Sequence, residues 1–183
     1  MNQKKSMPDL ERKTVDEFKA AEKIPVIVVL DEVRSMNNVG SVFRTADSFL
    51  IEAIYLCGMT PKPPHRDIQK TALGATETVR WKYFETTKAA VEELRNEDYT
   101  IYSVEQVHGS KMLNAIELKA GVKRAFVFGN EVNGVQEEII SLSDGVIEIP
   151  QLGSKHSLNI SVSAGIVLWE ISKRYLIPIP FSF

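Results

Sequence analysis

The sequence predicts an α/β fold with a mostly parallel sheet of about six strands and helices on both of its faces. Short β-branched runs alternate with amphipathic segments along the chain, an order that is typical of parallel sheets. The first run, at 24–30, has almost no polar residue, as expected for a strand buried on both faces. Polar clusters also stand where strands are expected to end, which is where open parallel sheets bind ligands.

The chain begins with a charged segment that has a weak helical pattern. Its apolar residues predict a helix that ends before Pro25. These residues are Leu10, Val15, Phe18 and Ala21. We expect residues 1–23 to form a charged tail and helix, and residues 24–183 to form a single domain. The strand at 24–30 precedes an amphipathic helix at 39–50, for which Asn38 is a natural N-cap.

The remaining elements continue the alternation. Short apolar or β-branched runs predict strands at 53–57, 79–84, 99–105, 124–128 and 146–149. Three prolines predict a loop over 58–67, namely Pro61, Pro63 and Pro64. Helices are expected at 68–73, 86–96, 111–115, 135–142 and 159–175. Thr86 or Thr87 is the expected N-cap of the helix at 86–96.

Length and composition favour an ordinary globular protein and exclude several classes. The chain has 183 residues and is 44% apolar and 25% charged. Its formal net charge is −2, so a nucleic-acid partner would have to bind a local basic patch. The single cysteine, Cys57, excludes an intrachain disulfide framework and a cysteine-based zinc site. Three scattered histidines predict no metal site. No apolar run reaches membrane-spanning length and the charged start lacks a signal peptide's apolar core, so we expect a cytoplasmic protein.

The first polar cluster runs from Asn38 to Arg44. Arg44 lies on the opposite side of the predicted helix from its apolar stripe, and Gly40 is expected to leave open space one turn away. A guanidinium above a bare patch of backbone suits a phosphate. The alternative is a surface pair of Arg44 with Asp47 or a hydrogen bond with Ser48, with Asn38 acting only as a cap.

The second cluster runs from Gly129 to Gly134, between a strand and a helix. Its glycines permit tight turns and close approach by a ligand. The spacing fits neither the dinucleotide-binding fingerprint nor the Walker loop. Glu131 would cap the next helix through the helix dipole, or it would hold Arg44 or a ribose hydroxyl, and the residues alone leave these readings open.

The third cluster, Ser157 to Asn159, stands at the start of the last helix. Ser157 or Asn159 would cap that helix, and the small residues that follow would let another backbone come close. His156 is more often a solvated bystander than a functional group. No catalytic triad, paired-carboxylate motif or metal-ligand spacing stands out, which favours transfer from a pre-activated donor or simple binding.

Taken in order, the three clusters resemble the motifs of the SpoU (TrmH-like) RNA 2′-O-ribose methyltransferases of the SPOUT superfamily. The motifs are Asn38 to Asp47, Phe128 to Val135, and Ile149-Pro150 with Ser157 to Ala164. The segment from Leu73 to Glu77 also resembles the family. The resemblance spans nearly the whole chain. One position departs from it, because Leu50 stands where relatives often have glycine, and we expect this to alter packing only.

The resemblance implies a C-terminal deep trefoil knot, a homodimer and S-adenosyl-L-methionine (SAM) as cofactor. It implies methyl transfer to a ribose 2′-hydroxyl of tRNA or rRNA, and the sequence does not say which RNA. By position, the cofactor would be bound by Gly129, Ile149 and Leu158. The catalytic set would be Arg44, Asn38, Glu131, Ser157 and Asn159, with Arg44 as general base or electrostatic activator. Because the net charge is negative, RNA binding must depend on local basic residues, and the candidates are Lys62, His65, Arg66, Lys70, Arg80, Lys82 and Lys155. The alternative is that these side chains are ordinary solvated surface residues.

Two other functions remain as alternatives. The first is a catalytically silent, knotted RNA-binding or assembly factor. The second is an α/β protein that binds a small nucleotide and needs no RNA.

Overall fold

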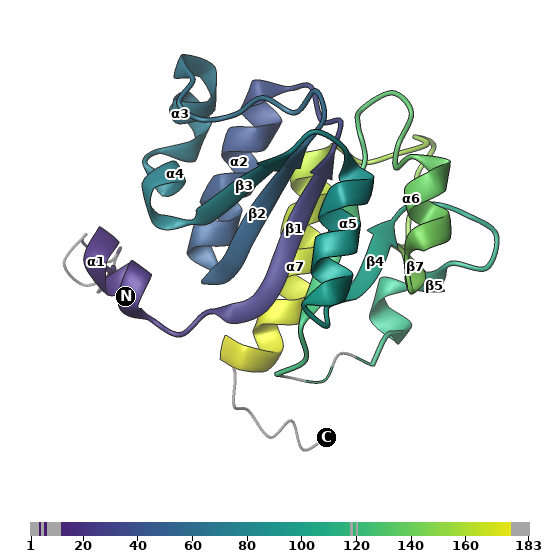
Figure 1. Cartoon of the computed structure of the whole chain (residues 1–183). Helices are drawn as coiled ribbons and strands as arrows, with labels where there is room; N and C mark the ends of the chain where they lie inside the picture. The colour runs from purple at the N-terminus through teal and green to yellow at the C-terminus, as the bar shows by residue number, and fades with distance from the viewer. Residues whose placement is uncertain (1–3, 5, 7–11, 118, 120, 177–183) are drawn as a thin grey trace.

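The computed structural model describes residues 4, 6, 12–117, 119 and 121–176, and it contains one seven-stranded sheet (Figure 1). The strand order is β3-β2-β1-β6-β4-β7-β5, and every pairing is parallel. The strands are β1 (Ile24–Asp31), β2 (Ile51–Cys57), β3 (Arg80–Phe84), β4 (Thr100–Val104), β5 (Lys111–Met112), β6 (Arg124–Phe128) and β7 (Gly145–Glu148). The predicted parallel α/β architecture is therefore confirmed.

Helices cover both faces of the sheet. The α-helices are α1 (Val15–Ala20), α2 (Met36–Ser48), α3 (Arg66–Ala72), α4 (Ala75–Thr78), α5 (Thr87–Asn96), α6 (Glu137–Leu142) and α7 (Ile160–Leu176), and η2 (Leu113–Ala115) is a 3₁₀ turn. In Figure 1, α2 and α7 lie behind the sheet while α5 lies in front of it. The division of the chain at residue 23 stays a prediction, although α1 lies in the segment where a helix was expected.

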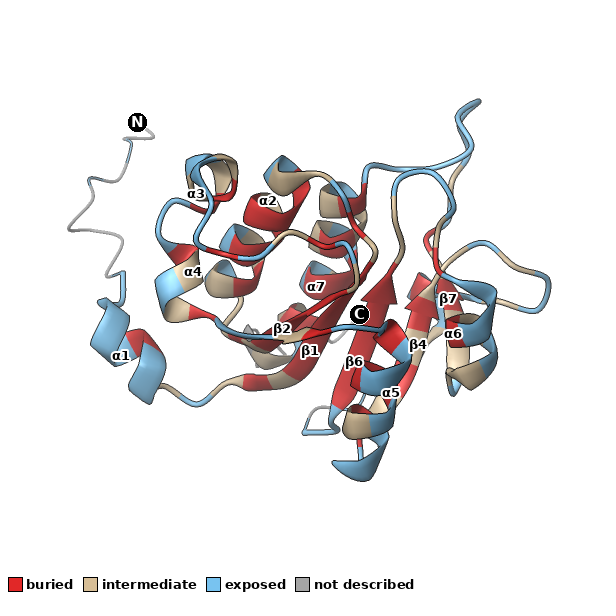
Figure 2. Cartoon of the chain, turned by 45° about the horizontal axis from the view of Figure 1, so that its top comes forward, coloured by how far each residue is buried: buried red, intermediate tan, exposed pale blue. Residues whose placement is uncertain are grey.

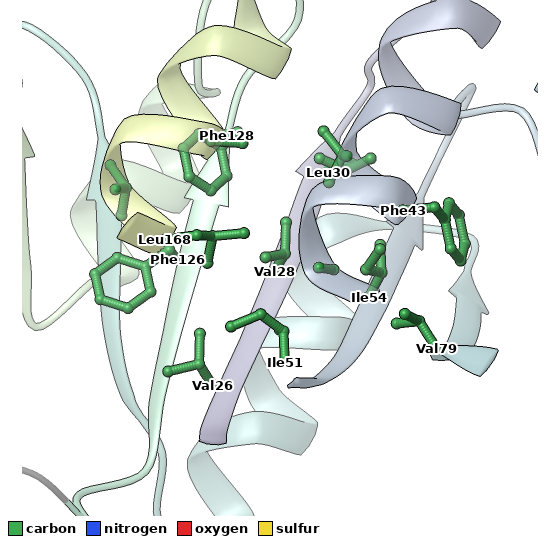
Figure 3. Close-up of a cluster of buried hydrophobic side chains, with 14 of the residues drawn as sticks. Val26, Val28, Leu30, Phe43, Ile51, Ile54, Val79, Phe126, Phe128 and Leu168 are labelled. Carbon is green, nitrogen blue, oxygen red and sulfur yellow. The ribbon is translucent and has the colours of Figure 1, made fainter. Parts of the chain in front are cut away.

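The core consists of two apolar layers, one on each face of the sheet. Alternate residues of β1 enter different layers, because successive strand side chains point to opposite faces. Val26, Val28 and Leu30 pack with α2 and α7 residues such as Leu168, as Figure 3 shows. Ile27 and Val29 pack with α5 and α6. The central strands are consequently buried along their length (Figure 2), as the nearly unbroken apolar run at 24–30 predicts.

The strand count is one higher than expected, because the segment at 111–115 is not a helix. Lys111 and Met112 pair with Ile147 and Glu148 of β7, and only the next three residues are helical. Ser110 adds a hydrogen bond of 2.7 Å from its hydroxyl to the Glu148 carboxylate. Tertiary pairing with β7 therefore overrides the local pattern, as is common for short segments.

The boundaries of α2 also differ from the prediction in a way that bears on the site. The helix begins at Met36, and the Ser35 hydroxyl caps it by accepting a hydrogen bond of 3.3 Å from the Asn38 amide. Asn38 is thus not the N-cap, and its side chain is free for other contacts. At the other end, Leu50 has φ of +53°, a backbone region that favours glycine, so its departure from the family pattern concerns backbone conformation as well as packing.

The parallel strand order brings the loops that follow the central strands to one edge of the sheet. From β1 the chain adds β2 and β3 on one side, whereas β6, β4 and β7 lie on the other side. The crevice at such a reversal, outside the carboxyl ends of the strands, is the usual ligand site of open parallel sheets.

Within the described residues, no helix is long and apolar enough to cross a membrane, and no cluster of metal-ligating side chains occurs.

Candidate active site

Glu131 connects the second motif to the first. Its carboxylate accepts hydrogen bonds from the backbone amides of Arg34 and Ser35, each at 3.2 Å, and from Asn38 Nδ2 at 2.9 Å. The two amides lie just before and at the N-cap of α2, where backbone N–H groups lack helical partners. Glu131 therefore caps α2, and within the described residues it neither caps the helix that follows it nor holds Arg44, two of the roles that the sequence left open.

The protonation state of Glu131 follows from these contacts. Burial raises the pKa of its carboxyl, but hydrogen bonds from Asn38, its own backbone amide, Arg34 and Ser35 outweigh burial, so the pKa lies below its usual value. Donors that stabilise a carboxylate have this effect in general. Glu131 is consequently a fixed anion at neutral pH.

Asn38 and Asn159 extend this connection to the third motif. Asn159 Nδ2 donates to Asn38 Oδ1 at 3.2 Å, so a hydrogen-bonded chain runs from Glu131 through Asn38 to Asn159. Asn159 also caps α7, because its Oδ1 accepts from the Ser161 amide at 2.9 Å. The expected cap is thus Asn159, whereas Ser157 is exposed and makes no hydrogen bond within the described part of the chain.

The second motif forms a compact turn. The Asn130 side chain accepts from the amides of Val132 and Asn133 at 2.8 and 2.7 Å, and the backbones of Asn130 and Gly134 bond to each other. A Cβ on Gly129 would lie 1.9 Å from the Gly134 carbonyl carbon. Gly129 therefore permits the close approach of two backbone segments, as glycine in such turns does.

Two carboxylates hold the end of this turn. Glu105, after β4, accepts from the Val135 amide at 3.0 Å, and Asp31, at the end of β1, accepts from the Gln136 amide at 2.9 Å. Asp31 is fully buried and also accepts from the Thr87 hydroxyl at 2.5 Å. Sequence reasoning missed both carboxylates, although each is a polar residue at the end of an apolar run, the signal by which the three clusters were found.

A cavity of about 670 Å³ opens beside these loops. Its volume is in the range of small-molecule sites. It is lined by the end of β4, the second-motif turn, α6 and the start of α7. Of the site residues expected from the sequence, those that line it are Gly129, Glu131, Ser157, Leu158 and Asn159.

Three expected site residues lie outside this lining. Ile149 is 9% exposed and packs into the core at the end of β7. Asn38 is 9% exposed and reaches the cavity only through Glu131 and Asn159. Arg44 is exposed on α2, and the described part of the chain offers its guanidinium no ion pair or hydrogen bond.

The surroundings of Arg44 correct two expectations. Asp47 does not pair with Arg44, because its carboxylate accepts a hydrogen bond from Thr78, and Ser48 bonds the Arg44 carbonyl, not its guanidinium. The space at Gly40 is not open either. A Cβ there would lie 2.1 Å from Thr71 Oγ1 and 2.3 Å from the Ile68 carbonyl oxygen, because α3 packs directly onto α2. Gly40 therefore serves helix packing, not a ligand.

Residues 25–169 match the model of the SpoU rRNA Methylase family, and the chain belongs to this family. A protein of Borreliella burgdorferi described as an uncharacterized tRNA/rRNA methyltransferase is 31% identical over 148 residues, which are 81% of this chain and 64% of that protein. The tRNA (guanosine(18)-2′-O)-methyltransferase of Thermus thermophilus is 26% identical over 165 residues, which are 90% of this chain and 83% of that enzyme. This chain therefore spans slightly under two thirds of the Borreliella relative.

Solved structures agree with this assignment. An AdoMet-bound rRNA methyltransferase from Sinorhizobium meliloti superposes with a TM-score of 0.77 at 26% identity, covering 85% of this chain and 58% of the other. The A. aeolicus TrmH/SpoU tRNA modifying enzyme has a TM-score of 0.78 at 23% identity, covering 88% and 81%, and shows the shared fold. SAM is the cofactor of this family. The cavity fits such a group, because it is large enough and the Gly129 turn leaves backbone exposed along its wall.

Proposed function

We propose that this chain is a SAM-dependent RNA 2′-O-ribose methyltransferase, with tRNA or rRNA as substrate. The observation that carries the proposal is the hydrogen-bonded chain from Glu131 through Asn38 to Asn159, which joins the three family motifs beside the cavity. The likeness to the Thermus enzyme, which acts on a guanosine ribose of tRNA, supports the ribose as acceptor.

The residues divide into binding and catalytic roles. Gly129 and Leu158 bind the cofactor from the cavity wall, and Ile149 shapes that wall from behind because it lies in the core. The bound cofactor supplies an activated methyl group. Glu131 fixes Asn38 and Asn38 in turn holds Asn159, so that Ser157 and Asn159 orient the ribose for in-line attack.

Arg44 acts on the acceptor RNA. A guanidinium is always protonated in proteins, so we assign Arg44 the role of electrostatic activator that holds a substrate phosphate and favours loss of the 2′-hydroxyl proton. Its exposed position, without an internal anion partner in the described structure, supports contact with an external phosphate. Because Arg44 stands outside the cavity lining, a second subunit would be needed to complete the site.

A homodimer fits this requirement. The outer face of α7 exposes three large apolar residues at helical spacing, Val162 (49% exposed), Ile166 (37%) and Trp169 (50%). The Trp169 ring lies 6.0 Å from that of Phe49, which follows α2, so this apolar face is continuous with the end of the helix that carries Arg44. Contiguous exposed apolar surface commonly marks a protein interface, and a second copy of α7 is the occupant we propose.

Fewer of the expected basic residues are free to contact RNA than the sequence suggested. Three of the expected basic residues have internal acidic partners: Lys70 bonds Asp67, Arg80 bonds Glu52, and Lys82 bonds Glu93. Lys62 and Arg66 have no such ion pair within the described residues. Their segment is tied to the loop after β1 by a hydrogen bond of 3.0 Å from the Val33 amide to Thr60 Oγ1. We therefore propose that RNA approaches the site over this side.

Two further features belong to the same proposal. The bond between Asn159 and Asn38 holds the start of α7 against the first turn of α2. We also propose the C-terminal trefoil knot that the family resemblance implies. The cytoplasm is the compartment that we propose for a protein that modifies tRNA or rRNA.

Methyl transfer to RNA, followed by mapping of 2′-O-methyl sites, tests the function. RNA from cells that lack the gene serves as acceptor for the purified protein and SAM. We expect Arg44→Ala to lower transfer at least 100-fold, within the range attributed to transition-state electrostatics, while SAM affinity stays nearly unchanged. Arg95→Ala, an exposed arginine of α5 on the other face of the sheet, is the control for loss of an arginine outside the site. Its guanidinium contacts the Leu142 carbonyl and Asp144, so the melting temperature of this variant is measured alongside its activity. Methylation of a base, or full activity of Arg44→Ala, would refute the proposal.

The catalytically silent RNA-binding factor is the second candidate, since Arg44 stands outside the cavity lining of a single chain. It predicts RNA binding without affinity for SAM. Isothermal titration of the chain with SAM separates the two functions, because only the enzyme binds it below millimolar concentration.

A further inference from the structure

The cavity beside the motif loops has an unusual charge balance. Three glutamates line it, Glu105, Glu131 and Glu137, whereas none of its lining residues is a lysine, arginine or histidine. A concave site lined by charges of one sign focuses their field on the ligand. The cavity therefore favours a ligand that carries positive charge.

Glu105 is a firmly held member of this set. Its two oxygens accept from the amides of Gln106 and Val135 at 2.8 and 3.0 Å. A Cβ on Gly134 would lie 2.1 Å from Glu105 Oε2, so the turn is built around this carboxylate. The oxygens of Glu131, in contrast, accept from three donors of the loop before α2 and of α2 itself. Glu105 is thus the fixed carboxylate of the wall on the β4 side.

The two forms of the family's cofactor differ in charge. Before transfer it carries a sulfonium cation, and after transfer S-adenosylhomocysteine (SAH) carries a neutral thioether. We propose that the glutamate lining, and Glu105 in particular, makes the cavity select the cationic form over the neutral one. This inference rests on the proposed cofactor cavity and does not depend on which RNA is methylated.

Such selection acts on binding and product release. A carboxylate that attracts the cation stabilises the bound state before transfer, and this attraction weakens as the charge at sulfur disappears. Interactions that favour the ground state do not raise the rate of the chemical step. Glu105 is therefore a specificity-determining residue, which loads the charged form and lets the neutral form leave.

Calorimetric titration of the full chain with SAM and, separately, with SAH tests the inference. Glu105→Gln removes the charge and also disturbs one of the two amide bonds, which affects both ligands. The informative quantity is therefore the ratio of the two dissociation constants. We expect Glu105→Gln to weaken SAM binding about 3- to 10-fold more than SAH binding, the size of effect of one partly solvated charge pair.

Three further variants make the result decisive. Glu105→Asp keeps the charge and should preserve the ratio even if both affinities fall. Glu137→Gln, at the cavity, should shift the ratio in the same direction. Glu138→Gln is the matched control, because this neighbour lies outside the lining and pairs with Lys88 at 2.8 Å. An unchanged ratio in Glu105→Gln would overturn the inference and leave the cavity intact, whereas failure of the unmodified chain to bind either ligand would overturn both.

Discussion

At the scale of single residues, Glu131 is the centre of the site. Its carboxylate joins two segments that lie 96 residues apart in the sequence, at Ser35 and Glu131 itself. Each donor that it accepts from would otherwise be an unpaired N–H group near a helix start, and such groups are costly to leave unsatisfied. Glu131 therefore acts on structure as well as on chemistry, and this has a consequence for pH dependence.

Glu131→Gln should change stability in a pH-dependent manner. Because the pKa of Glu131 is lowered in the folded state, its contribution is present above the ordinary glutamate pKa of about 4.3 and is lost as pH falls through the lower folded value. We expect the melting temperature of the unmodified chain to exceed that of Glu131→Gln at pH 7 and the two curves to converge in acid. Thermal melts between pH 3 and 7 measure this, and a constant difference at all pH values would contradict it.

Residue-level prediction from the sequence found some of the residues that line the cavity, because local order along the chain identifies the motifs; the catalytic and binding roles of these residues stay predictions. Glu131 and Asn159 were recognisable from their motifs, and both line the cavity. The partner of Glu131 was not recognisable, because the contact with Asn38 exists only after β1 and β6 become neighbours. Asn38 was assigned to the N-cap for a similar reason, since Ser35 competes for that place and only the backbone geometry decides.

At the scale of elements, α3 packs closely on α2 near the site. Gly40 lies at this contact, where the helices meet through backbone atoms as well as side chains. The Thr71 hydroxyl also donates to the Asn37 carbonyl at 3.0 Å, which fixes the position of one helix along the other. Arg44 lies one turn further along α2, so its placement depends on this contact.

Gly40→Ala should therefore destabilise the protein despite the better helix propensity of alanine. The added Cβ would meet the Ile68 carbonyl oxygen, a backbone atom that cannot rotate away, and we expect a loss of about 2–3 kcal/mol, typical of overpacking. Urea unfolding measures the change. Gly153→Ala is the control, because nothing lies within 4 Å of the added methyl group, and it should shift stability by less than about 0.5 kcal/mol. Equal effects of the two substitutions would contradict this assignment.

Most elements were predictable because their apolar patterns are strong. The run in β1 and the stripe of α2 gave the right type of element, with ends displaced by a few residues. The segment at 111–115 was predicted wrongly, since two of its residues form β5 only by pairing with β7, and no local pattern reports that pairing. Gly40 was likewise taken for open space, because a glycine in a sequence does not reveal which element fills the gap.

At the scale of the whole molecule, the exposed face of α7 is the feature that one chain leaves unexplained. Apolar side chains that face water lower the solubility of a protein unless a partner covers them. Trp169 lies in the proposed interface, and a half-exposed tryptophan is a common anchor residue of protein interfaces.

Trp169→Glu should convert a dimer into a monomer. A charge at this place would be buried without a counter-ion in the dimer, whereas it remains hydrated in the single chain. Light scattering coupled to size-exclusion chromatography reports the mass. Trp81→Glu, on the edge strand β3, replaces a tryptophan that is 36% exposed and should leave the dimer intact. A monomeric mass for the unmodified chain would refute the homodimer.

The position of β6 between β1 and β4 has a consequence for how the chain folds. β1 pairs with β2 after a single crossover through α2, whereas its other edge stays unpaired until residues 124–128 are available. Contacts of such sequence separation form late, because loop closure costs entropy before any contact repays it. During synthesis, one edge of an apolar strand therefore stays unpaired until residues 124–128 have emerged. The first and second motifs meet only when this edge closes, so we expect competence to bind the cofactor to appear after this step.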